Sequence, residues 1–257
     1  MISLKGKIVC ITGASAGIGL ACAREFAKQG TRLLLSARRV DRLRHLTDEL
    51  RESYGTISHV FALDVMKPAD VEKAFTTLPA EWKPIDILVN NAGLSRGLDR
   101  LQEGKLQDWE EMIDTNVKGL LYVTRQVLPG MVARKSGHVL NLGSIAGHQV
   151  YPGGNVYCAT KSAVNALSHA MRMDLLGTGV RVCSIEPGLV QTEFSEVRYR
   201  GDKEKARVVY QNTRPLQPDD VADVVVFTAT RPPHVDISEV IIMPTDQASV
   251  YHVHRTS

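Results

Sequence analysis

Two residues four positions apart, Tyr157 and Lys161, have the side chains and the spacing for proton transfer. In a helix, this spacing places both side chains on the same face. A tyrosine hydroxyl has a pKa of about 10, but a neighbouring ammonium favours the phenolate and lowers that pKa. The pair could therefore serve as a general acid and base. Because Tyr-x-x-x-Lys is common by chance, an ordinary helix face is the alternative interpretation.

Ser144 is a third candidate, because it follows an apolar run, residues 138–142, that reads as a buried strand. In open α/β sheets, ligands bind at the carboxyl ends of the strands. We therefore expect the Ser144 hydroxyl at a ligand-binding edge, where it could hydrogen-bond the carbonyl or alcohol oxygen of a substrate.

A glycine-rich segment, residues 12–19 (TGASAGIG), joins an expected strand at 7–12 to an expected helix at 18–29. Glycines allow a tight turn in which backbone N–H groups approach a pyrophosphate, and the helix N-terminus adds a partial positive charge. The alternative is a glycine-rich turn without a ligand, but the strand before it and the helix after it favour a dinucleotide site.

The next expected strand, residues 32–36, leads into Ala37, Arg38 and Arg39. A carboxylate here would bind the ribose 2′-hydroxyl of NAD, and alanine cannot accept that hydrogen bond. Two guanidinium groups can instead pair with a 2′-phosphate. The sequence thus favours NADP(H) over NAD(H). Alternatively, the two arginines only begin a solvated helix.

Short apolar runs alternate with longer amphipathic stretches along the chain, which is typical of βαβ units with a parallel sheet. We therefore predict one α/β domain over residues 1–257, a Rossmann fold with a doubly wound parallel sheet of about seven strands. Residues 188–218 show no regular pattern, and we expect a substrate lid there. The remaining expected strands are 57–63, 86–90, 138–142, 180–186 and 239–243, and the remaining expected helices are 40–54, one after Pro68, one or two within 106–135, and 156–176.

Composition excludes several classes of protein. The 257 residues carry a net charge of +3, with acids and bases mixed, and contain 44% hydrophobic residues. These values exclude a disordered chain, and the absence of a basic stripe argues against nucleic acid as a partner. Four scattered cysteines without a CxxC pair argue against disulfides and a zinc site and favour a reducing compartment, so we expect a cytoplasmic protein.

The uncharged run at residues 8–23 has the outline of a signal peptide, but its glycines fit the strand, loop and helix better. No apolar run reaches the roughly 18 residues of a transmembrane helix, so we expect no membrane association.

Taken in order, the motifs resemble the short-chain dehydrogenase/reductase family over nearly the whole chain. They are residues 12–19, Asn90-Asn91-Ala92-Gly93, Asn116, Ser144, Tyr157-Cys158-Ala159-Thr160-Lys161 and Pro187-Gly188. The resemblance implies a reversible hydride transfer between a nicotinamide and a hydroxyl-bearing or carbonyl carbon, which needs no metal.

The resemblance also implies the site residues. Tyr157 would exchange a proton with the reacting oxygen, Lys161 would hold the nicotinamide ribose and lower the Tyr157 pKa, and Ser144 would orient that oxygen. Asn116 would bend its helix and hold a water in a proton relay. The implied cofactor-binding residues are Gly13, Ser15, Ala16, Gly17, Ile18, Gly19, Arg38, Arg39, Asp64, Val65, Asn91, Ala92, Gly93, Tyr157, Lys161, Pro187, Gly188, Val190 and Thr192.

Several stretches, among them residues 78–82, 112–116, 153–157, 185–190 and 192–202, resemble the bacterial NADP-dependent 3-hydroxy acid dehydrogenases. That group includes serine and allo-threonine dehydrogenases and malonic semialdehyde reductases. The resemblance implies a small 3-hydroxy acid, a 3-oxo acid or semialdehyde product, and a homotetramer.

The expected substrate contacts are Ser144, Tyr157, Gln149 and Arg198. A carboxylate suits a planar guanidinium, and both Arg198 and Arg200 lie in the expected lid. Alternatively, these arginines are solvated or pair with Glu196 and Asp202. Further pocket candidates are Ser95, Arg96, His148 and Tyr151.

Two other functions remain open at this stage. The same catalytic residues would serve a broader ketone, aldehyde or 3-oxoacyl reductase. A catalytically silent NADP-binding sensor is the more remote alternative, because Tyr157 and Lys161 are both present.

Overall fold

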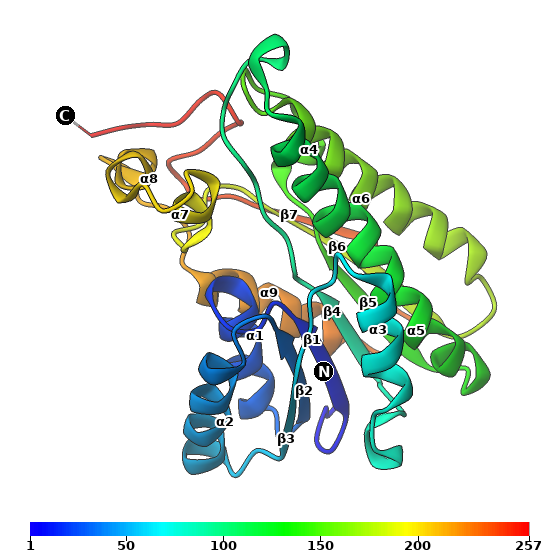
Figure 1. Ribbon diagram of the computed structural model, residues 1–257. Helices are drawn as coiled ribbons and strands as arrows, with labels where there is room; N and C mark the ends of the chain where they lie inside the picture. The colour runs from blue at the N-terminus through cyan, green and yellow to red at the C-terminus, as the bar shows by residue number, and fades with distance from the viewer. Residues whose placement is uncertain (257) are drawn as a thin grey trace.

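A seven-stranded, all-parallel sheet forms the centre of the computed structural model, which describes residues 1–256. Its strand order is β3-β2-β1-β4-β5-β6-β7 (Figure 1). This is the Rossmann arrangement expected from the sequence. The strands are β1 (Ile8–Thr12), β2 (Arg32–Ala37), β3 (Ser58–Ala62), β4 (Ile87–Asn90), β5 (Gly137–Leu142), β6 (Val180–Pro187) and β7 (Glu239–Ile242).

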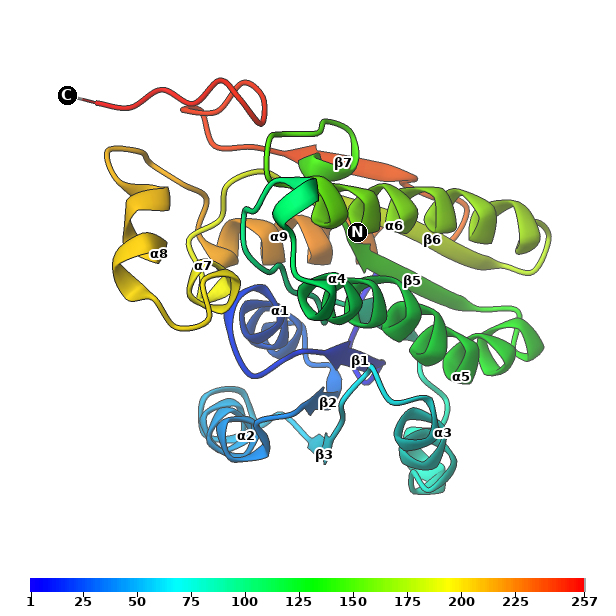
Figure 2. The ribbon, with the colours of Figure 1, turned by 45° about the horizontal axis from the view of Figure 1, so that its top comes forward.

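Helices cover both faces of this sheet. Figure 2 shows α1, α2 and α9 on one side and α3, α4, α5 and α6 on the other, with α7 and α8 beyond the sheet edge. The helices are α1 (Gly17–Lys28), α2 (Val40–Tyr54), α3 (Pro68–Thr76), α4 (Leu106–Ile113), α5 (Leu120–Ala133), α6 (Asn155–Asp174), α7 (Phe194–Arg198), α8 (Lys203–Tyr210) and α9 (Pro218–Ala229).

The core has two apolar layers, because the central strands are buried on both faces. Alternate residues of β1 belong to different layers: Val9 and Ile11 pack under α1, α2 and α9, whereas Ile8 and Cys10 pack under α3, α5 and α6. All five residues of β1 are buried. This explains why the central strands appear in the sequence as continuous apolar runs rather than as alternating patterns.

The connection from β1 leads to β2 on one side, and β4 lies on the other side of β1. A crevice opens at such a reversal, outside the carboxyl ends of the strands. The loops after β1, β4, β5 and β6 all reach this edge. The glycine-rich segment, Asn91, Ser144 and Pro187 therefore lie close together at this edge, although they are far apart in the sequence.

The predicted strands agree with the observed ones to within one residue at each end, and the N-terminal uncharged run forms β1, the glycine loop and part of α1. Two regions hold more structure than the sequence indicated. Within 106–135, a π-helical turn, Asp114–Gly119, joins α4 to α5. The irregular segment 188–218 contains α7 and α8, and Asp202 caps α8 by accepting a hydrogen bond from the Lys205 N–H.

In the described part of the chain, no helix combines the length and the apolar character needed to cross a membrane.

Candidate active site

A cavity of about 750 Å³ lies at the carboxyl edge of the sheet, between the strand ends and the helices α7 and α8. Its volume falls within the range of small-molecule and cofactor sites. With the exception of Gly19, every predicted cofactor-binding residue lines it. Ser144, Tyr157, Lys161 and Arg198 line it as well, whereas Asn116 and Gln149 do not.

The glycine loop is held in place by Asn91. The Asn91 side-chain amide donates to the carbonyl oxygens of Thr12 at 2.9 Å and Gly13 at 3.2 Å. Gly13 has a φ of +67°, and a Cβ there would lie 2.9 Å from the Asn91 Nδ2 atom. A Cβ on Gly19 would overlap the same amide. Gly19 therefore serves the packing of the loop rather than the cavity wall.

The N-terminus of α1 faces the cavity through Ala16, Gly17 and Ile18. No side chain caps this helix and no acidic residue occupies its first turn. Its first N–H groups are consequently available to an anion, and the helix dipole adds to the attraction. This backbone geometry fits the pyrophosphate of a dinucleotide.

Arg38 and Arg39 lie at the end of β2, beside this loop, and line the cavity. Arg39 also pairs with Glu193 at 2.9 Å, and Arg42 pairs with the same carboxylate at 2.6 Å. Although burial raises the pKa of the Glu193 carboxyl, the hydrogen bonds from Arg42 and Arg39 lower it overall. Sequence reasoning missed Glu193 and Arg42, because the pair forms across 151 residues of chain.

Tyr157 and Lys161 lie one turn apart on α6 and are buried together at the cavity floor. The Lys161 ammonium donates to the Leu142 carbonyl oxygen at 2.7 Å and lies 6.0 Å from the centre of the Tyr157 ring. The Ser144 hydroxyl lies at the start of the turn after β5 and accepts a hydrogen bond from the Ala146 N–H. The fold thus brings the three predicted catalytic side chains to one place.

Burial controls the protonation of this group. Burial and the nearby Tyr151 raise the pKa of the Tyr157 hydroxyl, while the Arg198 charge and the Ser144 hydroxyl act in the opposite direction. Burial also lowers the pKa of Lys161 to about 8, although the Glu186 charge opposes this. The pKa of Tyr157 is raised overall, because desolvation outweighs the groups that act in the opposite direction.

Asn116 is buried behind the site and lies in the π-helical turn. Its side chain accepts from the Leu94 N–H at 2.8 Å and donates to the Leu94 carbonyl at 2.8 Å and the Thr160 hydroxyl at 3.0 Å. Asn116 therefore links the loop after β4 to α6. The regular α-helix is interrupted at this residue by the π-helical turn, and the side-chain groups of Asn116 are engaged with protein atoms.

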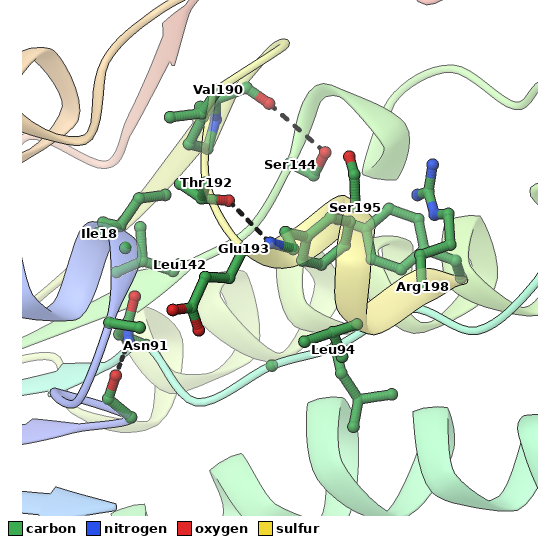
Figure 3. A pocket seen from close by; sticks show the side chains of 18 of the residues that line it. Ile18, Asn91, Leu94, Leu142, Ser144, Val190, Thr192, Glu193, Ser195 and Arg198 are labelled. Carbon is green, nitrogen blue, oxygen red and sulfur yellow. Dashed lines mark hydrogen bonds between the residues drawn. The ribbon is translucent and has the colours of Figure 1, made fainter. Parts of the chain in front are cut away.

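Arg198 projects from α7 into the same cavity as Ser144 (Figure 3). Its guanidinium donates to the Ser95 hydroxyl at 3.1 Å and the Tyr151 hydroxyl at 3.0 Å. The guanidinium carbon lies 5.4 Å from the centre of the Tyr157 ring. A guanidinium cation therefore lies beside the Tyr157 ring, and it donates to two neutral hydroxyl groups.

Arg198 and Arg200, the two candidate partners for a substrate carboxylate, have different surroundings. Arg200 pairs with Asp108 and Glu111 on α4, outside the cavity. Neither arginine pairs with Glu196 or Asp202; Asp202 instead pairs with Lys205.

Gln149 was expected to contact substrate, but it lies outside the cavity. Its side-chain oxygen accepts a hydrogen bond from the Val250 N–H at 3.0 Å, so it fastens the C-terminal segment. That segment contributes Val250, Val253 and Arg255 to the cavity wall. Sequence reasoning missed these three residues because no sequence pattern marks them. It also missed Phe194, whose ring centre lies 5.6 Å from that of Tyr157.

Comparisons with known proteins agree with this geometry. A family model described as short chain dehydrogenase matches residues 7–203. The NADP-dependent 3-hydroxy acid dehydrogenase YdfG of Salmonella typhi is 50% identical over 251 residues, which cover 97% of this chain and 100% of that protein. The NADP-dependent 3-hydroxy acid dehydrogenase of Schizosaccharomyces pombe is 42% identical over 256 residues, 99% of each chain.

Solved structures lead to the same family. The closed form of a serine dehydrogenase complexed with NADP+ superposes with a TM-score of 0.91 at 50% identity, covering 97% of this chain and 100% of that one. A serine dehydrogenase from Escherichia coli gives a TM-score of 0.81 at 45% identity, covering 94% and 99%. The chain belongs to the short-chain dehydrogenase/reductase family.

Proposed function

We propose that this protein interconverts a small 3-hydroxy acid and its 3-oxo acid or semialdehyde, using NADP(H). The observation that carries the proposal is the Arg198 guanidinium, which shares one cavity with Tyr157, Lys161 and Ser144. The dependence on NADP and the 3-hydroxy acid substrates of the similar dehydrogenases support it.

The cavity fits NADP(H) in three respects. The turn at Gly13 and the uncapped N-terminus of α1 leave backbone N–H groups for the pyrophosphate. Arg38 and Arg39 offer guanidinium groups to a 2′-phosphate, with Arg39 also paired to Glu193, and residues 36–40 at the end of β2 include no acidic residue. When bound, the nicotinamide supplies or accepts the hydride. Residues 187–192 lead from β6 along the cavity and are proposed to hold its amide.

Tyr157 is proposed to move the proton. In reduction its hydroxyl protonates the carbonyl oxygen, and its raised pKa keeps it protonated at neutral pH. In oxidation the phenolate takes the proton of the alcohol, and the Lys161 ammonium stabilises that phenolate. Ser144 holds the reacting oxygen by a hydrogen bond, so that the oxygen meets the Tyr157 hydroxyl.

Arg198 is proposed to bind the substrate carboxylate. Ser95 and Tyr151 accept hydrogen bonds from Arg198 without neutralising it, so its charge remains available. A planar guanidinium can pair with a carboxylate bidentately. Because Arg198 lies on α7, we also propose that residues 188–218 form the substrate lid.

A broader carbonyl reductase is the second candidate. It is favoured by the apolar part of the cavity wall, where Leu98, Phe194 and Val208 would accept a larger, uncharged substrate. A catalytically silent NADP-binding sensor is the less supported alternative, since Tyr157, Lys161 and Ser144 lie together in the cavity.

The proposal is tested with a panel of 3-hydroxy acids and matched carboxylate-free alcohols, each assayed with NADP⁺ and NAD⁺. We expect kcat/KM at least about tenfold higher for the hydroxy acids and for NADP⁺, as loss of a charged contact costs roughly 1.5–3 kcal/mol. Equal turnover of the carboxylate-free alcohols would favour the broader reductase. Equal rates with NAD⁺ would remove the proposed role of Arg38 and Arg39.

We further propose a homotetramer located in the cytoplasm. The four cysteines are free and buried, which suits a reducing compartment. Light scattering of the purified protein measures the mass directly, and a monomeric mass contradicts the assembly.

A further inference from the structure

Glu186, near the end of β6, is completely buried directly behind the active site. A buried carboxylate is costly unless hydrogen bonds compensate for the lost water. None of the proposed catalytic steps uses this side chain, so its position calls for a different explanation.

The carboxylate is bonded to the segment that carries Ser144. One Glu186 oxygen accepts from the Ser144 backbone N–H, and the other accepts from the Ser184 hydroxyl. A Cβ on Gly143 would overlap the carboxylate, so the backbone lies directly against it. Glu186 thus contacts two consecutive residues, Gly143 and Ser144, at the point where β5 turns away from the sheet.

Charged and titratable groups on three other elements face Glu186. They are Lys161 on α6, His148 after the turn that follows Ser144, and Glu239 on β7. His148 pairs with Glu239 at 2.9 Å. The pKa of the Glu186 carboxyl is raised overall, because burial outweighs the hydrogen bonds from Ser184 and Ser144 and the charge of Lys161, which act in the opposite direction.

We propose that Glu186 is a positioning residue for the reaction: by accepting the Ser144 N–H, it sets the direction of the Ser144 hydroxyl. This inference rests on the proposed function, in which Ser144 holds the reacting oxygen. The Ser144 hydroxyl is weakly fixed otherwise, with a 3.4 Å contact to the Pro187 carbonyl and a bond from the Ala146 N–H at 3.1 Å. The direction of the Ser144 hydroxyl therefore depends mainly on the position of the Ser144 backbone, which Glu186 holds.

If this is correct, kcat should depend on the length of the side chain at position 186 and not on its charge. Gln at position 186 keeps an acceptor of the same length for the Ser144 N–H, and the Ser184 hydroxyl can accept from its amide. Asp keeps the charge but withdraws the acceptor by one methylene. Leu fills the space without an acceptor. Glu239→Gln is the matched control, because it removes a carboxylate from the same cluster without touching Ser144.

The experiment measures kcat, KM and NADPH affinity for Glu186→Gln, Glu186→Asp and Glu186→Leu, alone and combined with Ser144→Ala. We expect Glu186→Asp and Glu186→Leu to lower kcat roughly tenfold to a hundredfold, since small misplacement of an orienting group costs about that much. Glu186→Gln should lose no more than about threefold. NADPH affinity should stay constant, and Glu239→Gln should match the wild type.

The combined variants decide whether the effect passes through Ser144. In the Ser144→Ala background, Glu186→Asp should change kcat by less than about twofold, because the group it aligns is gone. If the effects multiply instead, or if Gln is as damaging as Asp, the inference is overturned. Should Glu186→Leu not fold, the comparison of Asp with Gln still decides. A Ser144→Ala enzyme with full activity would overturn both this inference and the proposed role of Ser144.

Discussion

The carboxyl edge of the sheet and the lid surround one cavity, yet they are held in different ways. At the sheet edge, buried side chains bind backbone atoms: Lys161 binds the Leu142 carbonyl, and Asn116 binds both polar groups of Leu94. In residues 188–218, the proposed lid, two charged side chains that line the cavity are instead held by other partly exposed side chains, Arg198 by Tyr151 and Glu193 by Arg39.

This difference separates the two tasks of the site. Buried groups bonded to the backbone are fixed in position and have strongly perturbed proton affinities, which suits the proton transfer. Partly exposed side-chain pairs contribute little stability and can exchange partners. Under the proposed function, the sheet edge would carry out the reaction, and residues 188–218, the proposed lid, would select the substrate.

The largest effect is expected at the sheet edge. Tyr157→Phe removes the hydroxyl that is proposed to exchange the proton, and we expect kcat to fall by about a thousandfold, the middle of the range for loss of an acid–base group. NADPH binding, measured by fluorescence titration, should change little. An equal rate in wild type and variant would remove Tyr157 from the mechanism.

In the lid, Arg198→Met should raise KM for a 3-hydroxy acid by about thirtyfold to a hundredfold, because a carboxylate loses a charged partner. Arg200→Met is the matched control, since Arg200 pairs with Asp108 outside the cavity. Its KM should stay within about twofold of wild type. If both variants shifted KM equally, the lid charge as a whole would matter, and the specific role of Arg198 would be lost.

The pH dependence compares the two directions of the reaction. The raised pKa of Tyr157 means that the phenolate is scarce at neutral pH, so oxidation should gain up to about tenfold between pH 7 and 8. Above the Lys161 pKa of about 8, the ammonium that stabilises the phenolate is lost, so the oxidation rate should stop rising. The rate of reduction, which uses the protonated Tyr157 hydroxyl, should not rise over the same pH range. Initial rates across this range test the assignment, and a flat oxidation profile contradicts it.

The smallest effect on activity is expected from His138, a buried residue of β5. Burial, with a smaller contribution from Arg181, lowers its pKa from 6.5 to about 3. As the pH falls, His138 is protonated near pH 6.5 in the unfolded chain but only near pH 3 in the folded protein. The folded state therefore loses stability relative to the unfolded state below pH 6.5. At pH 5 the loss is about 2 kcal/mol. His138→Leu should unfold in urea with less dependence on pH between 7 and 5, at unchanged activity. If the variant is equally acid-sensitive, other groups are responsible.

The sequence by itself determined the alternation of strands and helices, because the apolar runs that build a parallel sheet are local and continuous. It also predicted Ser144 at the carboxyl edge of the sheet, where ligands bind, and Tyr157 and Lys161 on one helix face, since residues four apart share a face. The fold then brought the three side chains into one cavity. Gln149 shows the limit of this reasoning, because adjacency to the Ser144 turn did not bring its side chain into the cavity.

The tertiary structure alone decided the partners of the long side chains. Arg198 and Arg200 are two positions apart, yet one enters the cavity and the other pairs with α4. Glu193 pairs with Arg39, 154 residues away in the chain, and Glu186 accepts the Ser144 N–H from a neighbouring strand. Such contacts depend on how far and in which direction a side chain extends after packing, and desolvation at those positions sets the proton affinities. No local pattern of residues encodes either property.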